Sequence, residues 1–266
     1  MSSHARGTRR CSETPWEHAA GRYACRARLW SGPGAPWHVF LGRPPGEASP
    51  ARTSGPAQEA AELVSRVRGD GRGAACLRQE HGVSVWRVRG RAPLERAGDG
   101  LSTDDPALVL GVQTADCVPI LIADRRRGAV AALHAGWRGT AAGIVPRALE
   151  HLSTEYGSRP LDLEAVLGPA IGACCYEVGE EVREAVAAGP LGRLAEFHSA
   201  PGGRWMLGLA RLNAVCLEAA GVDPRRVQLL AVCTRCGGDR LYSFRGEGPG
   251  TGRNWSFIAP AAPPER

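Results

Sequence analysis

The chain has 266 residues, of which 43% are hydrophobic, and it carries a formal net charge of +6 at pH 7. This length and composition suit a soluble globular protein with a sizeable core, and no apolar run approaches the roughly 20 residues that a membrane helix needs. The cationic residues are all arginines and are scattered along the chain, which argues against a nucleic-acid footprint but remains compatible with an acidic small substrate.

The beginning of the chain and its cysteines suggest where the protein works. An Arg-Arg pair occurs near the start, but no apolar segment follows it, so the segment does not resemble a signal peptide. Nine cysteines are an odd number, which is more consistent with thiols or metal ligands in a reducing compartment than with a disulfide framework. We therefore expect a cytoplasmic protein without membrane contact.

The first half of the chain predicts a helix and several strands between flexible segments. Residues 1–20 are polar and arginine-rich, and we expect a disordered tail there. Residues 41–56 are rich in Gly and Pro, which indicates a loop, and apolar residues then recur at helical spacing over 58–68. β-like runs follow at 74–77, 83–88 and 107–123, and the last of these is broken near a cysteine.

The second half predicts further helices and strands. A buried strand is expected at 129–134, then a turn at 137–140 and a helix ending near Tyr156. Pro146 means that this helix either begins late, near Ile144, or kinks. Two more helices are expected at 177–188 and 209–220 and a strand at 227–232. No linker interrupts this region, so we expect one domain over 21–258 and a Pro-rich tail over 259–266.

Three motifs in the middle of the chain contain residues that bind metals. They are QEHG, which contains His81, QTADCVP, which contains Cys117, and HAGWRG, which begins at His134. If the strands are neighbours, two imidazoles and one thiol converge, and three such ligands with one vacant position are the arrangement of a catalytic zinc ion. Each residue alone could instead be structural, as a core histidine or a buried thiol.

Several arginines could meet an anion. HAGWRG ends an apolar strand and opens a helix, so backbone N–H groups beside Arg138 can face a phosphate, although the motif is also compatible with an ordinary turn that packs Trp137 in the core. Arg245 and Arg253 lie in polar segments near the C-terminus. These segments could close over a phosphate or ribose, or they could be surface loops.

Cys233 and Cys236 have the spacing of a redox pair or of half a structural zinc site. A zinc ribbon needs a second C-x-x-C pair, and the chain has none. Cys174 and Cys175 are adjacent in the sequence, so we do not expect them to supply the missing half. We favour a structural or incidental role for these cysteines.

Taken in order, the segments QEHG, DGLST, QTADCVPILIAD, HAGWRGTAAGI and GPAIGACCYEVGEEV, followed by CT, YSFR and TGR, resemble the YfiH-like laccase-domain family. This family is also called the polyphenol oxidase or purine nucleoside phosphorylase family, and the resemblance covers roughly residues 74–258. It implies an α+β fold, a single-domain α/β/β/α layered sandwich with mixed sheets. It also implies a zinc ion at positions that match His81, Cys117 and His134, with copper as the alternative metal.

The resemblance implies an activity as well. Members have been described as copper-dependent laccases and as enzymes that cleave adenosine, inosine, guanosine or methylthioadenosine with phosphate and deaminate adenosine. Seven histidines are too few for a multicopper cluster, which favours the second description. We expect a zinc-dependent purine nucleoside phosphorylase with adenosine deaminase activity. Its partners would be a nucleoside and phosphate, without nucleic acid, and no protein partner is indicated.

Roles for individual residues follow from the same reasoning. We expect catalytic roles for Cys117, His134 and Asp116, with the Asp116 carboxylate orienting a water or a metal ligand. Substrate contacts are expected from five further side chains, namely Arg138, Gln79, Tyr176, Arg245 and Arg253.

Two other functions remain open. Cys117 could be a nucleophile activated by His134, as in a cysteine hydrolase acting on amide substrates. The chain could also bind a metal or a partner without turnover, since it departs from the family pattern near residues 28–33 and at Gly208 and Pro146. The sequence leaves open the preferred nucleoside, the balance of phosphorolysis and deamination, the physiological metal and the oligomeric state.

Overall fold

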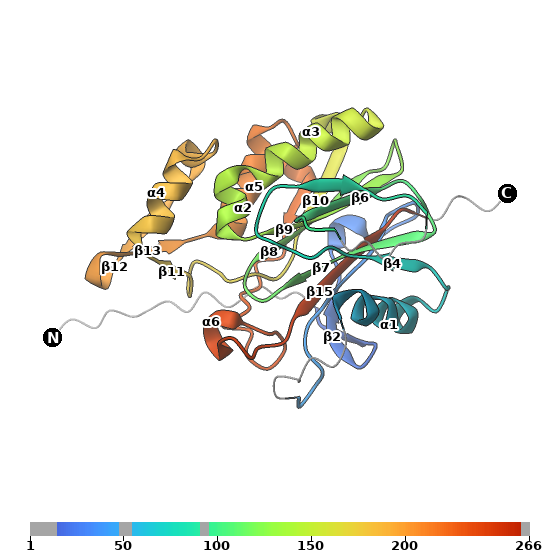
Figure 1. Cartoon of the computed structure of the whole chain (residues 1–266), viewed down its shortest axis with the longest axis horizontal. Helices are drawn as coiled ribbons and strands as arrows, with labels where there is room; N and C mark the ends of the chain where they lie inside the picture. The colour runs from blue at the N-terminus through green and yellow to red at the C-terminus, as the bar shows by residue number, and fades with distance from the viewer. Residues whose placement is uncertain (1–14, 48–54, 91–95, 262–266) are drawn as a thin grey trace.

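The computed structural model of the protein describes residues 15–47, 55–90 and 96–261. Within them the strands form two six-stranded mixed sheets and one small three-stranded sheet. The two large sheets pack face to face, with helices α2, α3 and α5 over one outer face and α1 over the other (Figure 1). The molecule is therefore a single-domain α+β protein with α/β/β/α layers, which confirms the predicted fold class.

The first sheet contains strands from both ends of the described chain. Its order is β1 (Glu17–Ala19), β2 (Arg22–Cys25), β3 (Trp37–Leu41), β15 (Asn254–Ala259), β7 (Leu108–Thr114) and β4 (Gly73–Ala75). All neighbours are antiparallel except β4 and β7. Helix α1 (Pro56–Arg68) covers the outer face of this sheet and begins with Pro at a position where a missing N–H is tolerated.

The second sheet has four antiparallel strands at its centre and a parallel strand at each edge. Its order is β14 (Val227–Leu229), β10 (Leu163–Leu167), β8 (Val118–Asp124), β9 (Ala129–Ala135), β6 (Gly100–Thr103) and β5 (Val85–Arg87). The broken β-like run that the sequence predicts over 107–123 is thus two strands, β7 and β8, which belong to different sheets.

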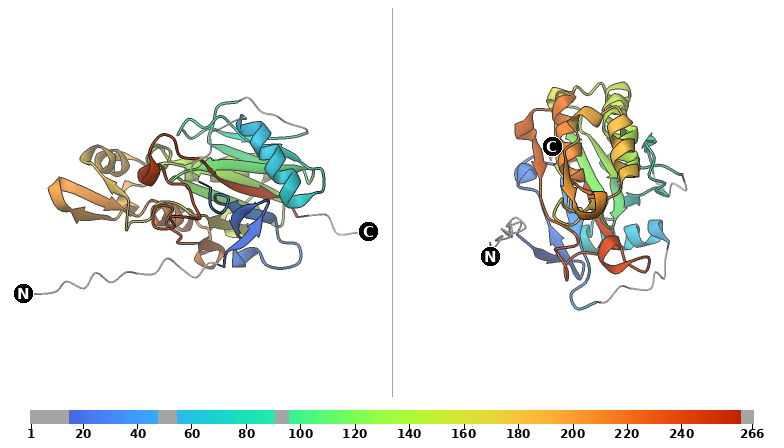
Figure 2. Two further views of the ribbon diagram at one scale, coloured as in Figure 1. Left: turned by 90° about the horizontal axis from the view of Figure 1, so that it is seen from below. Right: turned by 90° about the vertical axis from the view of Figure 1, so that its left-hand side faces the viewer.

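Alternation of side chains along the strands explains the layers, which Figure 2 shows from two further sides. On β8, Ile120 and Ile122 face the helices, whereas Leu121 lies between the two sheets. On β15, Trp255 and Phe257 pack toward α1 on the opposite side of the molecule. Both faces of each central strand are buried, so the strands read as nearly continuous apolar runs.

Three helices, α2 (Trp137–Ala142), α3 (Ile144–Tyr156) and α5 (Leu209–Ala219), cover the second sheet. The segment expected to be a turn at 137–140 is already helical as α2. Gly143, with φ of +88°, ends α2 and begins α3, and this left-handed conformation favours glycine. Pro146 is the third residue of α3, where no intrahelical N–H bond is lost, so α3 begins at Ile144 and needs no kink.

A smaller unit extends from the sandwich beside α2 (Figure 1). It consists of the sheet β11 (Glu177–Val178), β13 (Arg204–Leu207) and β12 (Phe197–Ala200), with helix α4 (Glu180–Ala188) packed on it. The helix expected at 177–188 therefore starts three residues late, because Glu177 and Val178 pair with β13 and Gly179 is extended.

The ordered fold reaches further than the expected tails allow. Because Glu17, His18 and Ala19 pair with residues 22–24 of β2, the sheet begins within the segment 1–20 that was expected to be disordered. The expected tail at 259–266 likewise overlaps the last residue of β15. Residues 1–14 and 262–266 lie outside the described residues. In the described part of the chain, no helix has the length and hydrophobicity to cross a bilayer.

Candidate active site

His81, Cys117 and His134 meet at the junction of the two large sheets. Cys117 immediately precedes β8, and His134 lies near the end of β9, where it is the register partner of Pro119. The antiparallel pair β8–β9 therefore brings the thiol and this imidazole together, and His81 arrives from the loop after β4 of the other sheet. The three ligand atoms lie within 4.8 Å of one another, which agrees with the predicted convergence.

A buried carboxylate that the sequence analysis did not select supports both histidines. Asp99 Oδ1 is 2.7 Å from His134 Nδ1, and the carboxylate accepts N–H bonds from His81 at 3.0 Å and from Gly82 at 2.6 Å. Although burial raises the pKa of Asp99, these bonds lower it below its usual range. Asp99 therefore fixes the ring of His134 and the loop of His81, whose φ of +62° is uncommon for a non-glycine residue.

Electrostatics favour the thiolate form of Cys117. Burial would raise the pKa of this thiol, but hydrogen bonds and charges from His134 and His81 outweigh burial and lower it. Burial would lower the pKa of His134, but its bonds to Asp99 and Cys117 raise it. A thiolate is the form that binds metals, and the bond from His134 Nδ1 to Asp99 leaves the other ring nitrogen available as a ligand.

This donor set fits a catalytic zinc ion. Two imidazoles and one thiolate provide three ligands, and a carboxylate behind a ligating histidine is the usual support of such a site. The packing is tight, because a Cβ atom on Gly136 would lie 2.8 Å from His81 Cδ2 and 3.1 Å from Cys117 Sγ. Glycine at this position thus makes room for two of the three ligands.

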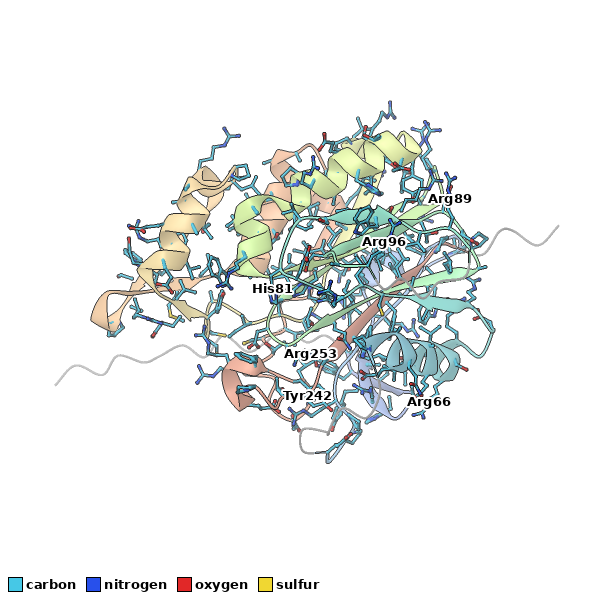
Figure 3. The ribbon with its side chains drawn as sticks, in the orientation of Figure 1. Arg66, His81, Arg89, Arg96, Tyr242 and Arg253 are labelled. Carbon is cyan, nitrogen blue, oxygen red and sulfur yellow. The ribbon has the colours of Figure 1, made fainter. Side chains whose placement is uncertain are left out.

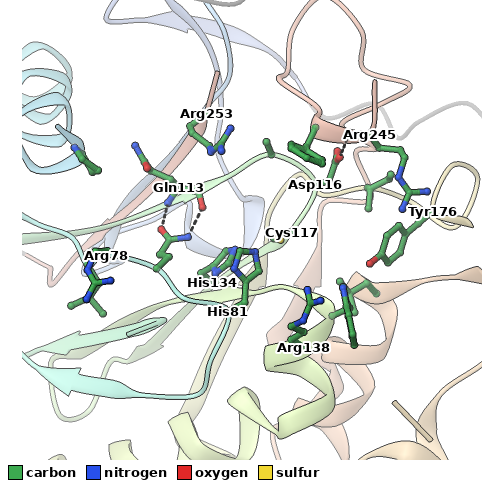
Figure 4. A pocket seen from close by; sticks show the side chains of 18 residues that line it. Arg78, His81, Gln113, Asp116, Cys117, His134, Arg138, Tyr176, Arg245 and Arg253 are labelled. Carbon is green, nitrogen blue, oxygen red and sulfur yellow. Dashed lines mark hydrogen bonds between the residues drawn. The ribbon is translucent and has the colours of Figure 1, made fainter. Parts of the chain in front are cut away.

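A cavity of about 570 Å³ opens beside this group, and every residue that the sequence analysis selected lines it (Figure 4). His81 and Arg253, which are 172 residues apart in the sequence, both line this cavity near the middle of the molecule (Figure 3). The volume is in the range of pockets that bind small molecules. The expected site residues are thus in one place.

Four arginines line the cavity, namely Arg78, Arg138, Arg245 and Arg253, of which Arg78 was not expected. The Arg138 guanidinium lies 4.2 Å from the ring centroid of Trp137, and that of Arg245 lies 5.3 Å from the ring of Tyr176. Arg245 Nη1 also donates to the carbonyl of Glu177 at 2.7 Å. Stacking on an aromatic ring holds the side chains of Arg138 and Arg245 in place, and the hydrogen bond to the backbone further fixes Arg245.

Aromatic rings from three different elements also line the cavity. Trp137 begins α2, Tyr176 precedes β11, and Phe244 begins the short helix α6 (Phe244–Glu247). Phe244 is 49% exposed, so it offers an apolar face at the cavity. Burial raises the pKa of Tyr176 to about 12, so its hydroxyl is protonated at neutral pH and can donate a hydrogen bond.

Gln79 and Asp116 are held by the protein itself. Gln79 Nε2 donates to the carbonyl of Gln113, and Gln79 Oε1 accepts the N–H of Gln113, both at 2.8 Å. Figure 4 shows this pair of bonds. The amide thus resembles one more rung of the sheet beside β7, and this geometry favours a positioning role for Gln79 over the substrate contact expected from the sequence.

Asp116 lies just before Cys117 and connects three segments. Its carboxylate accepts from Thr234 Oγ1 at 2.6 Å, from Ser243 Oγ at 2.7 Å and from the N–H of Arg245 at 2.6 Å. With both oxygens occupied in this way, the carboxylate positions the Arg245 segment against the cavity. The geometry therefore favours a positioning role for Asp116 over the expected catalytic one.

Four cysteines form a second group outside the cavity. The sulfur atoms of Cys174, Cys175, Cys233 and Cys236 all lie within 4.8 Å of one another. The fold thus places Cys174 and Cys175 beside the C-x-x-C pair, which the sequence analysis did not expect. The sequence does not indicate this arrangement, because the segment of Cys174 and Cys175 meets that of Cys233 and Cys236 only in the folded chain.

Comparison with known proteins reveals relatives and structures that resemble the chain. A family model described as multi-copper polyphenol oxidoreductase laccase matches residues 56–261. The purine nucleoside phosphorylase of Deinococcus radiodurans is 40% identical over 185 residues, which are 69% of each chain. The purine nucleoside phosphorylase YfiH of Escherichia coli is 35% identical over 184 residues, which are 68% of this chain and 72% of that relative.

Solved structures agree with these matches. YlmD from Geobacillus stearothermophilus superimposes with a TM-score of 0.75 at 27% identity, covering 94% of this chain and all of that one. A YfiH protein from Bacillus licheniformis gives a TM-score of 0.74 at 28% identity, covering 84% of this chain and 92% of that one. The layered architecture is therefore shared over nearly the whole described chain.

Proposed function

The chain belongs to the multi-copper polyphenol oxidoreductase laccase family, also called the YfiH-like family, and we propose that it is a purine nucleoside phosphorylase. One observation carries this proposal. Arginines and aromatic rings line the same cavity as the His81, Cys117 and His134 group. A nucleoside and a phosphate need these two kinds of contact, and several relatives carry the name purine nucleoside phosphorylase.

In this proposal the aromatic side chains bind the purine, and the arginines bind the phosphate. The purine stacks on Trp137 and Phe244, and the Tyr176 hydroxyl donates to the base. Phosphate oxygens accept from the guanidiniums of Arg138 and Arg245, whose planar donors match an oxyanion. The expected substrates are adenosine, inosine, guanosine and methylthioadenosine.

The reaction replaces one bond to the sugar with another. A phosphate oxygen bonds to C1 of the ribose while the bond from C1 to the purine nitrogen breaks, and the electron pair leaves with the base, which then takes up a proton. The arginines hold the phosphate in line and balance its charge, which is positioning rather than covalent catalysis. The products are the free base and ribose 1-phosphate.

We further propose that His81, Cys117 and His134 hold a zinc ion. Bound there, zinc would supply a Lewis acid beside the substrate. The role of the chain is to keep Cys117 as a thiolate and, through Asp99, to fix the imidazole of His134 and the backbone of the loop that carries His81. Three protein ligands with one open position also support the deamination of adenosine, in which water adds at C6 of the purine and ammonia leaves.

Two other activities and one non-enzymatic role are tested against this proposal. The family description supports a copper-dependent polyphenol oxidase. The proximity of Cys117 to His134 supports a cysteine hydrolase for amides, and a metal-binding protein without turnover is the non-enzymatic alternative. Among the described residues the His81 group is accompanied only by an all-cysteine group, which offers none of the further imidazoles that a multicopper centre needs.

The experiment incubates purified protein of known metal content with each nucleoside, with and without phosphate. Free base, ribose 1-phosphate and inosine are followed by chromatography and mass spectrometry. We expect release of base that depends on phosphate and is lost in Cys117→Ala and His134→Ala but kept in Cys25→Ala, a matched control at a buried thiol outside both cysteine and histidine groups.

The other outcomes each point elsewhere. Turnover of phenols only with copper would replace the proposal with oxidase chemistry. Amide hydrolysis that survives chelation but not thiol alkylation would identify a cysteine hydrolase. Protein that carries zinc and turns over none of these substrates would contradict an enzymatic role for the cavity.

A further inference from the structure

The four-cysteine group is formed by two turns that the fold holds side by side. Residues 173–175 form a turn in which the N–H groups of Cys175 and Tyr176 bond to the carbonyl of Gly172. In the second turn the N–H of Gly237 bonds to the carbonyl of Cys233. A parallel bridge between Ala170 and Cys233 joins the two segments, so their sulfur atoms are brought together by backbone contacts.

We propose that Cys174, Cys175, Cys233 and Cys236 bind one zinc ion through four thiolates, as a second metal site distinct from the one in the cavity. This proposal does not depend on the proposed function. It also accounts for the C-x-x-C pair, which the enzymatic mechanism does not use.

The spacing of the sulfur atoms suits a single tetrahedral ion. Zinc–sulfur bonds of about 2.3 Å place the corners of the tetrahedron about 3.8 Å apart. Cys174 Sγ lies 3.6 Å and Cys175 Sγ 3.2 Å from Cys236 Sγ, and all four sulfurs lie within 4.8 Å of one another. An iron–sulfur cluster needs wider spacing, because its cysteines bind different iron atoms.

Backbone groups are arranged to support a thiolate in this group. The N–H groups of Gly172, at 3.3 Å, and of Cys236, at 3.5 Å, point at Cys233 Sγ. Cys233 is buried and accepts from both turns, whereas Cys174 and Cys236 are exposed, so an ion can enter from solvent. Disulfides would pair the sulfurs two by two, whereas the mutual distances bring all four sulfurs within reach of a single ion.

An ion at this position would fasten two walls of the cavity. Cys175 is followed by Tyr176, which lines the cavity, and Cys233 is followed by Thr234, which donates to Asp116. The site is closed, with four protein ligands and no open position, which is the arrangement of a structural rather than a catalytic zinc. Its loss should loosen the cavity without removing the His81 group.

The experiment measures metal content and spectrum in two complementary variants. Cys174→Ser/Cys236→Ser disrupts the four-cysteine group, and His81→Ala/Cys117→Ala disrupts the cavity group. We expect one zinc ion per chain in the His81→Ala/Cys117→Ala protein, and one fewer in the Cys174→Ser/Cys236→Ser protein than in the unmodified protein and the Cys25→Ala control. Cobalt bound to His81→Ala/Cys117→Ala should give the intense charge-transfer and tetrahedral bands of four thiolates, whereas cobalt at the cavity should give those of one thiolate.

Each alternative outcome overturns the proposal. One would be a His81→Ala/Cys117→Ala protein that folds but binds no metal, and another would be a cobalt spectrum without four-thiolate bands. A third would be a disulfide among the four cysteines, found by mass spectrometry after alkylation of protein prepared with zinc and reductant. The cavity variant alone tests the four-thiolate site even if the cysteine variant does not fold.

Discussion

The two groups of side chains that could hold a metal ion differ in how the fold positions their members. His81, Cys117 and His134 come from strand ends and a neighbouring loop, and a buried carboxylate bonds to both histidine segments. The four cysteines come from two turns, and one of them, Cys233, accepts from two backbone N–H groups. The first group faces the cavity, whereas the second lies outside it. The comparison teaches that a buried carboxylate orients the group at the cavity, whereas two turns joined by backbone contacts are enough to gather the cysteines.

We expect the largest effect from a change to Asp99, which supports the group of His81, Cys117 and His134. Asp99→Asn keeps the shape but removes the charge and one acceptor from a site with three close contacts. We expect zinc affinity at this group to fall about 10- to 100-fold, the usual effect of losing such a support. Competition with a chelator measures it. The four-cysteine group should keep its ion, and an unchanged affinity at the cavity would show that Asp99 does not support the ligands.

His38, which lies outside both groups, makes the stability of the fold itself depend on pH. Burial lowers the pKa of His38 to about 4, and its ring accepts the N–H of Ala27 at 2.7 Å in the neutral form. In the unfolded chain the pKa of a histidine is about 6.5. Between pH 6.5 and pH 4 the unfolded chain therefore binds more protons than the folded chain, and the free energy of unfolding falls as the pH falls.

We expect His38 to account for about 2 kcal/mol of the free energy of unfolding lost between pH 7 and pH 5. Urea unfolding at a series of pH values, compared between the unmodified protein and His38→Gln, measures this contribution. Acid loss that remains in the variant comes from other titratable groups, among them His151, whose pKa burial also lowers. If both proteins show the same slope, His38 does not titrate as its burial requires.

The smallest expected effect tests the connection between the two groups. Thr234→Val removes the bond from Thr234 to Asp116, which still accepts from Ser243 and Arg245. We expect a loss of about 1–2 kcal/mol in the free energy of unfolding, since the bond is to a charged group. KM for phosphate should rise more than kcat falls, because Arg245 is displaced rather than removed. Equal metal content in variant and parent is the control, and an unchanged KM would argue against the connection.

Much of the fold was readable from the sequence because both faces of the central strands are buried. Their apolar runs indicated β8 and β9, and the motifs at their ends indicated Cys117 and His134. Helix ends were less accurate, since Glu177 and Val178 pair with a strand that the local pattern does not reveal. The layered fold itself came from the family resemblance and not from periodicity.

The parts of the site that were missed depend on contacts between distant segments. Asp99 lies 35 residues before His134, with which it pairs, and no spacing rule links the two. The roles of Gln79 and Asp116 depend on which groups their side chains meet, which the sequence does not state. The four-cysteine group likewise joins turns about 60 residues apart.

The pair of hydrogen bonds between the Gln79 side chain and the backbone of Gln113 affects how the protein moves. Strand β4 pairs with β7 only as far as Leu110, and further along β7 the side chain of Gln79 takes over as its neighbour. The loop that carries His81 is thus coupled to the thermal motion of the sheet rather than moving as a free surface segment. An imidazole on irregular backbone is thereby tied to a strand, and the wall of the cavity to which it belongs is braced by the sheet.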